Sequence, residues 1–365
     1  MTIPKPTLPV SFLKINSEMV FLAGSILSSF GILLVTVGGS WDITNHLLNN
    51  PETFFSPPHA LMYFGVAISL FGVVFSFLGW KNLLNHKNHY FVSLKFKLIG
   101  IALLTGAGPF DFVWHSNFGL DGLLSPPHIT LILGMFLCSI GGMIGISRYL
   151  KFNDLRNSIP SSLTILAILP VWLSGSGIIS SLSLPFSNTD YFEFNPEPTF
   201  AFVLATLAFP FLISLSMLLV FRLSNFRFGM ITLLSALFLL ISSFTSIVPN
   251  FAIVESIQFY SLNLIPFLIS DVILLFDKSK KSIIFAGGLL GSIFYIVYYP
   301  YVLYTFNDVL LGKLVSPSLI YFVYFEIIQD VLMLTFAPAV LMGILAALLS
   351  TNLSKKILMN KSDSV

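Results

Sequence analysis

Two segments of the chain carry the same polar residues at the same spacing. Both read D-x3-H-x9-S-P-P-H, and corresponding positions are 69 residues apart. Each segment therefore holds an aspartate, a histidine four residues later and a second histidine thirteen residues after the first. In the first segment these are Asp42, His46 and His59; in the second they are Asp111, His115 and His128.

Two imidazoles and one carboxylate are a ligand set for a divalent transition metal. Imidazole binds zinc, copper, iron and nickel, and two histidines with one carboxylate also form the facial ligand set of non-haem iron enzymes. Of the six histidines in the chain, only His86 and His89 lie outside the two motifs. The motifs predict metal binding. The alternative is that the Asp and His residues only form hydrogen bonds at helix ends, copied by a gene duplication.

The local sequence predicts how each set comes together. Ser56 and Ser125 each precede two prolines, which is typical of a helix start, with serine as the N-cap and proline in the first turn. The histidine that follows would lie in that first turn. Upstream, an Asp and a His four residues apart share one face of a helix. A short loop between the two helices would then return the second histidine to the first pair.

The composition predicts that these helices cross a membrane. The chain is 56% hydrophobic and 9% charged, whereas soluble domains have about 25% charged residues. Apolar runs of about 20 residues recur along it, so we expect an all-α, polytopic integral membrane protein with about ten transmembrane helices. A single cysteine, Cys138, excludes a disulfide framework within one chain. The predicted spans are 18–39, 59–80, 96–114, 128–149, 161–184, 199–221, 229–249, 256–276, 283–304 and 317–349.

The basic residues predict the orientation. All but Lys313 of the 18 Lys and Arg residues fall on one side of the predicted spans, including Lys81, Lys87, Lys95 and Lys97 in one loop. The positive-inside rule makes that side the cytoplasm, with both termini there and both motifs on the extracytoplasmic face of the cell membrane. Basic residues this dispersed do not indicate nucleic-acid binding. The last apolar run, interrupted by Pro338, is either one kinked helix or two shorter elements.

The duplicated motif predicts a tandem two-helix repeat in the N-terminal part. Because both helix pairs have the same orientation, a pseudo-twofold axis would run along the membrane normal. The predicted units are a cytoplasmic segment, two repeats, a C-terminal membrane region and a basic cytoplasmic tail. They cover residues 1–17, 18–80, 81–149, 150–350 and 351–365.

The motif is similar to the copper-site motif of the C subunit of the copper membrane monooxygenases, the particulate methane and ammonia monooxygenase family. In that pattern an Asp is followed at four by a His and at seventeen by another His, with Thr-Pro shortly before the last. The second segment is the more similar, with Trp114 and Asp121, whereas the first has Asn45 and Glu52. The resemblance implies that all six motif residues bind copper. Those implied to surround the metal are Glu52, Ser56, Trp114, Asp121 and Ser125.

The resemblance covers about eighteen residues per copy plus the flanking spans, and two departures stand out. The family's subunit has one such motif, and this chain has six further predicted spans. The chain also lacks the soluble copper-binding domain that those complexes carry on another subunit. A distant relative, a fused duplication and a convergent site all fit, and zinc or iron remains an alternative to copper.

Three functions follow from these features. The first is a copper-binding, monooxygenase-like component that acts on a small apolar or uncharged substrate, in the bilayer and either with other membrane subunits or as a homo-oligomer. The second is a metal transporter or delivery protein, in which Glu326 and Asp330, four residues apart in the last span, line the route. The third is an accessory subunit without metal. Spans five to seven contain few polar residues, which favours a fixed site over transport.

Overall fold

The structure is a computed structural model that describes residues 16–47, 53–119, 123–157, 161–183, 195–249, 251, 254, 261–292 and 317–358. Of the side chains in these ranges, those at 46–47, 161 and 317–332 are not described. The described residues are helical and contain no strand. The helices are α1 (Ser17–Leu47), α2 (Pro57–Lys81), α3 (Lys87–Phe118), α4 (Pro126–Phe152), α5 (Ser161–Ser183), α6 (Pro198–Leu223), α7 (Met230–Ile247), α9 (Leu264–Phe276) and α11 (Pro317–Leu358), together with a helix at 280–292.

Eight of the described helices are long and apolar enough to cross a membrane. They are α1 to α7 and the Met333–Leu358 part of α11, so the prediction of an all-α, polytopic membrane protein is confirmed. The described parts of predicted spans eight and nine are α9 and the helix at 280–292. The last apolar run is one helix that continues through Pro338.

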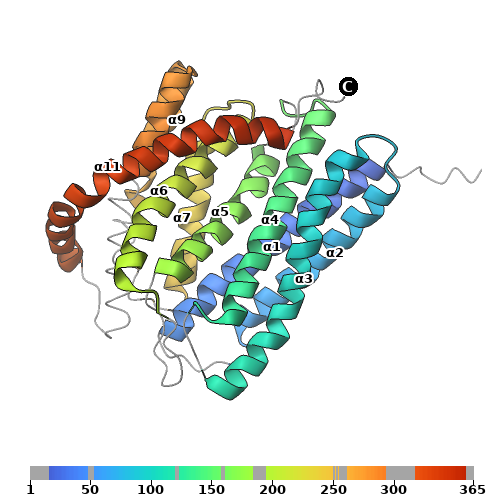
Figure 1. The fold of residues 1–365 in the computed structure, drawn as a ribbon, viewed down its shortest axis with the longest axis horizontal. Coiled ribbons are helices and arrows are strands. Elements are labelled where there is room, and N and C mark those ends of the chain that lie inside the picture. The colour runs from blue at the N-terminus through green and yellow to red at the C-terminus, as the bar shows by residue number, and fades with distance from the viewer. Residues whose placement is uncertain are drawn as a thin grey trace, which may run out of the picture.

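The N-terminal helices form two closely packed hairpins, α1 with α2 and α3 with α4 (Figure 1). Small residues line both seams. A Cβ atom at Gly31 would lie 2.5 Å from the carbonyl oxygen of Gly65 and 2.5 Å from the amide nitrogen of Ser69. Small residues let the backbones of membrane helices approach this closely, so van der Waals contact between backbones can hold the hairpin together.

The second hairpin makes the same contacts 69 residues later. A Cβ atom at Gly100 would lie 2.7 Å from the carbonyl oxygen of Gly134 and 2.5 Å from the amide nitrogen of Cys138. These three positions correspond to Gly31, Gly65 and Ser69 of the first hairpin. Matching positions therefore make matching helix contacts well beyond the two motifs, while the boundaries of the sequence units stay predictions.

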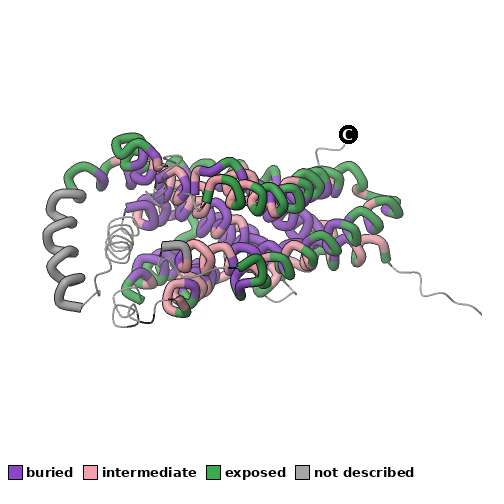
Figure 2. Tube along the Cα trace, turned by 90° about the horizontal axis from the view of Figure 1, so that it is seen from below, coloured by how far each residue is buried: buried purple, intermediate pink, exposed green. Residues whose placement is uncertain are grey.

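The outer faces of the bundle are apolar. Buried residues lie along the inside of the helices and exposed residues along the outside (Figure 2). Large apolar side chains are among the exposed ones, for example Phe64, Phe71 and Phe75 of α2. In a soluble protein such a surface would be unfavourable, but lipid tails solvate it. The helices are therefore suited to a lipid bilayer, and the remaining partners stay predictions.

Lys97 lies inside the bundle, where the sequence prediction was wrong. The prediction counted Lys95 and Lys97 with a basic loop at the start of the span predicted at 96–114, but α3 already begins at Lys87. The Lys97 side chain is fully buried and its Nζ donates to the hydroxyls of Ser25 (2.8 Å) and Ser76 (2.7 Å). A buried ammonium group is tolerated only with such partners, and these partners lie on two other helices.

Arginines join helix ends at the end of the bundle where α4 and α6 finish. Arg148 of α4 is buried and donates to the carbonyl oxygen of Ile357 near the end of α11 (3.0 Å). Arg222 of α6 donates to the hydroxyls of Ser350 (3.1 Å) and Thr351 (2.7 Å) of α11. These bonds fix the last turns of α11 against α4 and α6, and Figure 1 shows α11 crossing the ends of these helices.

Asp271 of α9 is buried and caps another helix. Its Oδ2 accepts hydrogen bonds from the backbone N–H (2.7 Å) and hydroxyl (2.6 Å) of Thr232, in the first turn of α7. We expect Asp271→Ala to destabilise the protein by about 1–2 kcal/mol, because losing a cap leaves first-turn amides unsatisfied. Unfolding in mixed micelles of increasing denaturing-detergent content would measure this.

Asp277 is the matched control for that experiment. It also accepts from a backbone N–H, that of Ser279 (2.8 Å), but in an exposed turn. Hydrogen bonds from Ser282 and Ser279 lower the pKa of the Asp277 carboxyl. Water can replace the carboxylate there, so Asp277→Ala should have a smaller effect than Asp271→Ala. Equal effects of the two substitutions would contradict the buried cap.

Candidate metal centre

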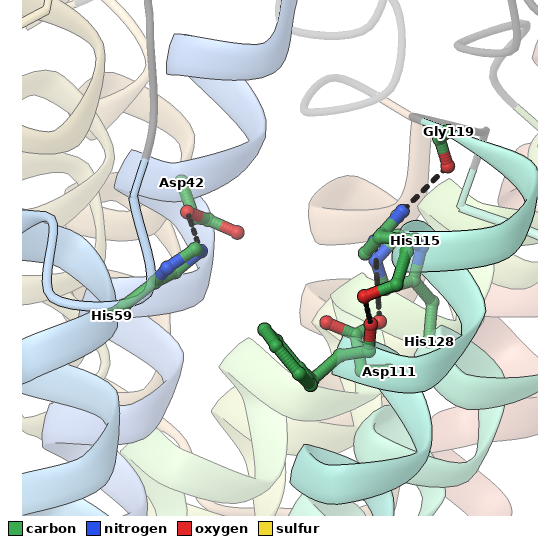
Figure 3. Close-up of polar contacts among 8 residues, drawn as sticks. Asp42, His59, Asp111, His115, Gly119 and His128 are labelled. Carbon is green, nitrogen blue, oxygen red and sulfur yellow. Dashed lines mark hydrogen bonds and ion pairs between the residues drawn. The ribbon is translucent and has the colours of Figure 1, made fainter.

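The second motif forms a compact cluster where α3 ends and α4 begins. Asp111 and His115 lie on the same face of the last turns of α3, and His128 lies in the first turn of α4 (Figure 3). One ligand atom from each residue can be chosen so that all three lie within 4.8 Å of one another. All three residues are partly buried. The spacing of the motif therefore does bring its three residues together, as the sequence predicts.

Two separations within the cluster fit ligands of one metal ion. Asp111 Oδ1 lies 3.4 Å from His115 Nε2 and 3.3 Å from His128 Nε2. Ligand atoms arranged tetrahedrally at about 2.0–2.1 Å from an ion are themselves about 3.3 Å apart. A direct hydrogen bond to a carboxylate would be shorter, at about 2.7–2.9 Å. The residues present therefore suit a first-row transition metal.

A backbone carbonyl orients the His115 ring. The Nδ1 atom of His115 lies 2.8 Å from the carbonyl oxygen of Gly119. A carbonyl can only accept, so this contact needs the proton on Nδ1, and in the neutral ring Nε2 then carries the lone pair that a metal can use. Metal-binding histidines are commonly oriented by a partner on their other nitrogen. Gly119 has a φ of +76° directly after α3, a conformation that glycine adopts readily.

The first motif makes the corresponding pair. Asp42 Oδ1 lies 2.8 Å from His59 Nε2, the distance of a direct hydrogen bond, whereas the same two atoms of Asp111 and His128 lie 3.3 Å apart (Figure 3). The Nδ1 atom of His59 lies 3.0 Å from the carbonyl oxygen of Thr53. This histidine is therefore oriented in the same way as His115, by a carbonyl in the adjoining loop.

The chain has no match among protein-family models, curated proteins or solved structures.

Several predicted site residues lie outside the part of the chain that the structure describes. For His46, Glu326 and Asp330, the backbone lies in α1 or α11 but the side chain is not described. Glu52 and Asp121 lie outside the described residues. Their predicted roles stay predictions. Trp114 is described and packs against Phe110 and Phe118, at centroid distances of 6.0 and 4.7 Å.

The predicted serine caps are only partly confirmed. Ser56 and Ser125 do occupy N-cap positions, with prolines in the first turn of α2 and α4. Neither side chain makes a capping hydrogen bond, although both serines are buried. The two prolines that follow have no N–H, so two of the three amides nearest a cap are missing. Both serines therefore stand at the start of their helices without a side-chain cap.

Aromatic residues that the motif did not indicate connect the two sites. Tyr63 packs beside His59 at 6.2 Å and beside Phe54 at 5.0 Å, and Phe54 packs edge-on against Phe112 at 5.5 Å. Phe112 directly follows Asp111 in the chain. Tyr63 is also close enough to interact electrostatically with both motif carboxylates. Among the described residues, the two motifs form neighbouring sites and not one merged cluster. Aromatic residues are frequent throughout this chain, so sequence gave no signal for these.

Proposed function

We propose that the chain is a membrane-embedded transition-metal-binding protein, and that its metal is copper. In this proposal Asp111, His115 and His128 bind one ion. The observation that carries it is the convergence of three ligand atoms within 4.8 Å, with His115 already oriented by the Gly119 carbonyl. Imidazole nitrogens suit copper among several metals, and the resemblance of the motif to the monooxygenase C subunit favours copper over zinc or iron.

The first motif would bind a second ion. Asp42 and His59 supply two ligands, and His46 supplies the third by its place in the motif. The same two atoms, Asp Oδ1 and His Nε2, face each other in both hairpins, and the 2.8 Å hydrogen bond of the first pair would open to admit an ion. In each hairpin a backbone carbonyl orients one motif histidine, His59 in the first and His115 in the second. Helix capping alone does not require such oriented imidazoles.

The resemblance further supports a role as a monooxygenase-like component acting on a small apolar or uncharged substrate. Copper, when bound, would supply one-electron and dioxygen chemistry. The residues of this chain would hold the metal and present an apolar approach from the bilayer. Phe54 is 46% exposed and Phe112 is 56% exposed, next to the two sites. A substrate dissolved in lipid would meet these rings before the ligands.

Metal content per chain tests the proposal. The full chain would be purified from its native membrane without added metal and measured by mass spectrometry for copper, zinc and iron. The variant replaces all four motif histidines, at positions 46, 59, 115 and 128, with alanine. We expect about two copper ions per wild-type chain and none in the variant, because ligand loss removes binding. The control is His86→Asn, which keeps a residue that tolerates the positive φ at this position and should leave the metal content unchanged.

The outcomes separate the parts of the proposal. Zinc or iron in place of copper would overturn the monooxygenase resemblance and keep the metal site. A wild-type chain without metal would overturn both and leave the motifs as helix-end hydrogen bonding. Retention of the metal in the four-histidine variant would show that other residues bind it.

A further inference from the structure

A polar cavity of about 240 Å³ lies at the other end of α4 from the metal centre. It is formed where the loop after α4 meets the loop after α6. Cavities that hold drug-sized ligands measure about 300–1,000 Å³, so this one suits a smaller group. Its lining residues are Lys151, Asp154, Arg156, Asn157 and Asn225.

The cavity lies at the depth where phospholipid head groups are found. Lys151 is in the last turn of α4, which ends at Phe152, and Asn225 follows the end of α6 at Leu223 by two residues. Both helices are long and apolar enough to span the membrane. Residues within a few positions of such helix ends lie at the boundary between hydrocarbon and water.

Hydrogen bonds between the two loops shape the cavity. The side-chain amide of Asn225 donates to Asn157 Oδ1 (2.7 Å), and Arg227 donates to the carbonyl oxygen of Asn157 (2.5 Å). Arg156 donates to the carbonyl oxygens of Arg222 (2.6 Å) and Leu223 (3.3 Å) at the end of α6. The walls are thus held in place by the protein, so a ligand need not order them.

The charges in the cavity are arranged for a ligand that carries both a phosphate and a hydrogen-bond donor. Within the described part of the chain, Asp154 forms no ion pair with Lys151 or Arg156, although all three line the same space. Arg156 uses two of its five N–H donors on α6 carbonyls. The remaining donors and the Lys151 ammonium suit phosphate oxygens, and the Asp154 carboxylate suits a donor.

We propose that this cavity binds a phospholipid head group whose terminal moiety donates hydrogen bonds, such as phosphoethanolamine or phosphoglycerol. The phosphate lies against Lys151 and Arg156, and the ammonium or hydroxyl groups of the head group donate to Asp154. Basic pockets at helix ends are a recurrent form of lipid-head-group site. Phosphocholine carries the same phosphate but has no N–H or O–H donor at its end, so it cannot make the hydrogen bond to Asp154.

Lipid binding to the delipidated full chain tests this proposal. Native mass spectrometry and the thermal unfolding midpoint would be measured with phosphatidylethanolamine, phosphatidylglycerol or phosphatidylcholine of identical acyl chains, and with inorganic phosphate alone. We expect phosphatidylethanolamine and phosphatidylglycerol to bind at least about tenfold more tightly than phosphatidylcholine. The reason is that a hydrogen bond to a carboxylate is stronger than one between neutral groups. Inorganic phosphate alone should stabilise the protein much less than these two lipids.

Three variants assign the contacts. Lys151→Gln should weaken phosphatidylethanolamine about tenfold, while Lys355→Gln, an exposed lysine near the end of α11, should change nothing. Asp154→Asn should reduce the preference for phosphatidylethanolamine over phosphatidylcholine, because the amide oxygen still accepts a hydrogen bond but carries no charge. Asp154 has a φ of +54°, which asparagine tolerates, so the loop should fold normally in this variant.

Three results would contradict the proposed head-group site. Equal affinity of the wild type for phosphatidylethanolamine and phosphatidylcholine would overturn the role of Asp154. Equal effects of Lys151→Gln and Lys355→Gln would overturn the site. Stabilisation by inorganic phosphate as large as that by lipid would make the ligand a free phosphate. None of these results depends on whether the motifs bind metal.

Discussion

Alanine at both Ser25 and Ser76 will destabilise the protein by about 3–6 kcal/mol while Lys97 is present, since each hydrogen bond to a charged group contributes about 1.5–3 kcal/mol. The Lys97 ammonium group is fully buried and donates to both hydroxyls. It also lies 4.3 Å from the centroid of the Phe21 ring. Without the two hydroxyls, the Lys97 amine would stay buried with both hydrogen-bond partners removed, and a buried donor left without a partner destabilises the fold.

The same two alanines should have little effect once Lys97 is replaced with methionine. Ser25 donates to the carbonyl of Phe21 and Ser76 to that of Gly72, so each hydroxyl proton is satisfied within its own helix. Removing these hydroxyls in the Lys97→Met background should therefore change stability by less than about 1 kcal/mol, helped by the higher helix propensity of alanine.

The comparison is a double-mutant cycle on the free energy of unfolding, measured in mixed micelles of increasing denaturing-detergent content. The serine pair and Lys97 should show a coupling of several kcal/mol. If the serine substitutions have the same effect in both backgrounds, the hydrogen bonds do not stabilise the buried lysine. Lys95→Met, at an exposed position two residues before Lys97, is the control for loss of a lysine from α3.

The sequence predicted the positions of the helices better than the side-chain contacts between them. Runs of apolar residues are sufficient to predict spans because every backbone group in lipid must be bonded within a helix. The same reasoning misplaced Lys97. Hydropathy assigns a lysine to a loop, whether or not the helix bundle contains hydrogen-bond acceptors for it. Those partners come from Ser25 and Ser76, more than twenty residues away in the chain. Contacts at that separation have no local signature.

The candidate site shows the same division. The convergence of Asp111, His115 and His128 follows from helical periodicity and a short loop, and both can be read from spacing. The carbonyls that orient His59 and His115 belong to Thr53 and Gly119. These contacts depend on loop conformation, which side-chain identity does not specify. Only the glycine directly after a helix gave a local signal, as a common helix terminator.

Gly100→Ala should both destabilise the protein and reduce metal binding at the second motif. The new Cβ would lie 2.5 Å from the backbone nitrogen of Cys138 and 2.7 Å from the carbonyl oxygen of Gly134. Backbone atoms cannot rotate away as a side chain can, so α3 and α4 must move apart. Overpacking of this kind destabilises by about 1–3 kcal/mol or more, and the unfolding midpoint would measure it.

Gly106→Ala is the matched control on the same helix. Nothing lies within 4 Å of a Cβ at Gly106, so the substitution should stabilise α3 by about 0.5–1 kcal/mol, as alanine does in an open helix position. The two Gly→Ala changes therefore have opposite predicted signs. Destabilisation by both to the same extent would mean that the seam at Gly100 is not a tight contact.

The metal measurement connects this seam to the site. Gly100 and Asp111 lie on α3, and His128 lies in the first turn of α4, so the distance between the helices sets the 3.3 Å separation of Asp111 and His128. Separating the helices by a few tenths of an ångström would move ligands out of reach of one ion, since metal–ligand distances vary by only about 0.2 Å. Gly100→Ala should thus lower the metal content per chain, and Gly106→Ala should not. Unchanged metal content in a destabilised Gly100→Ala variant would show that the site tolerates helix movement, and so that its geometry is not set by the glycine seam.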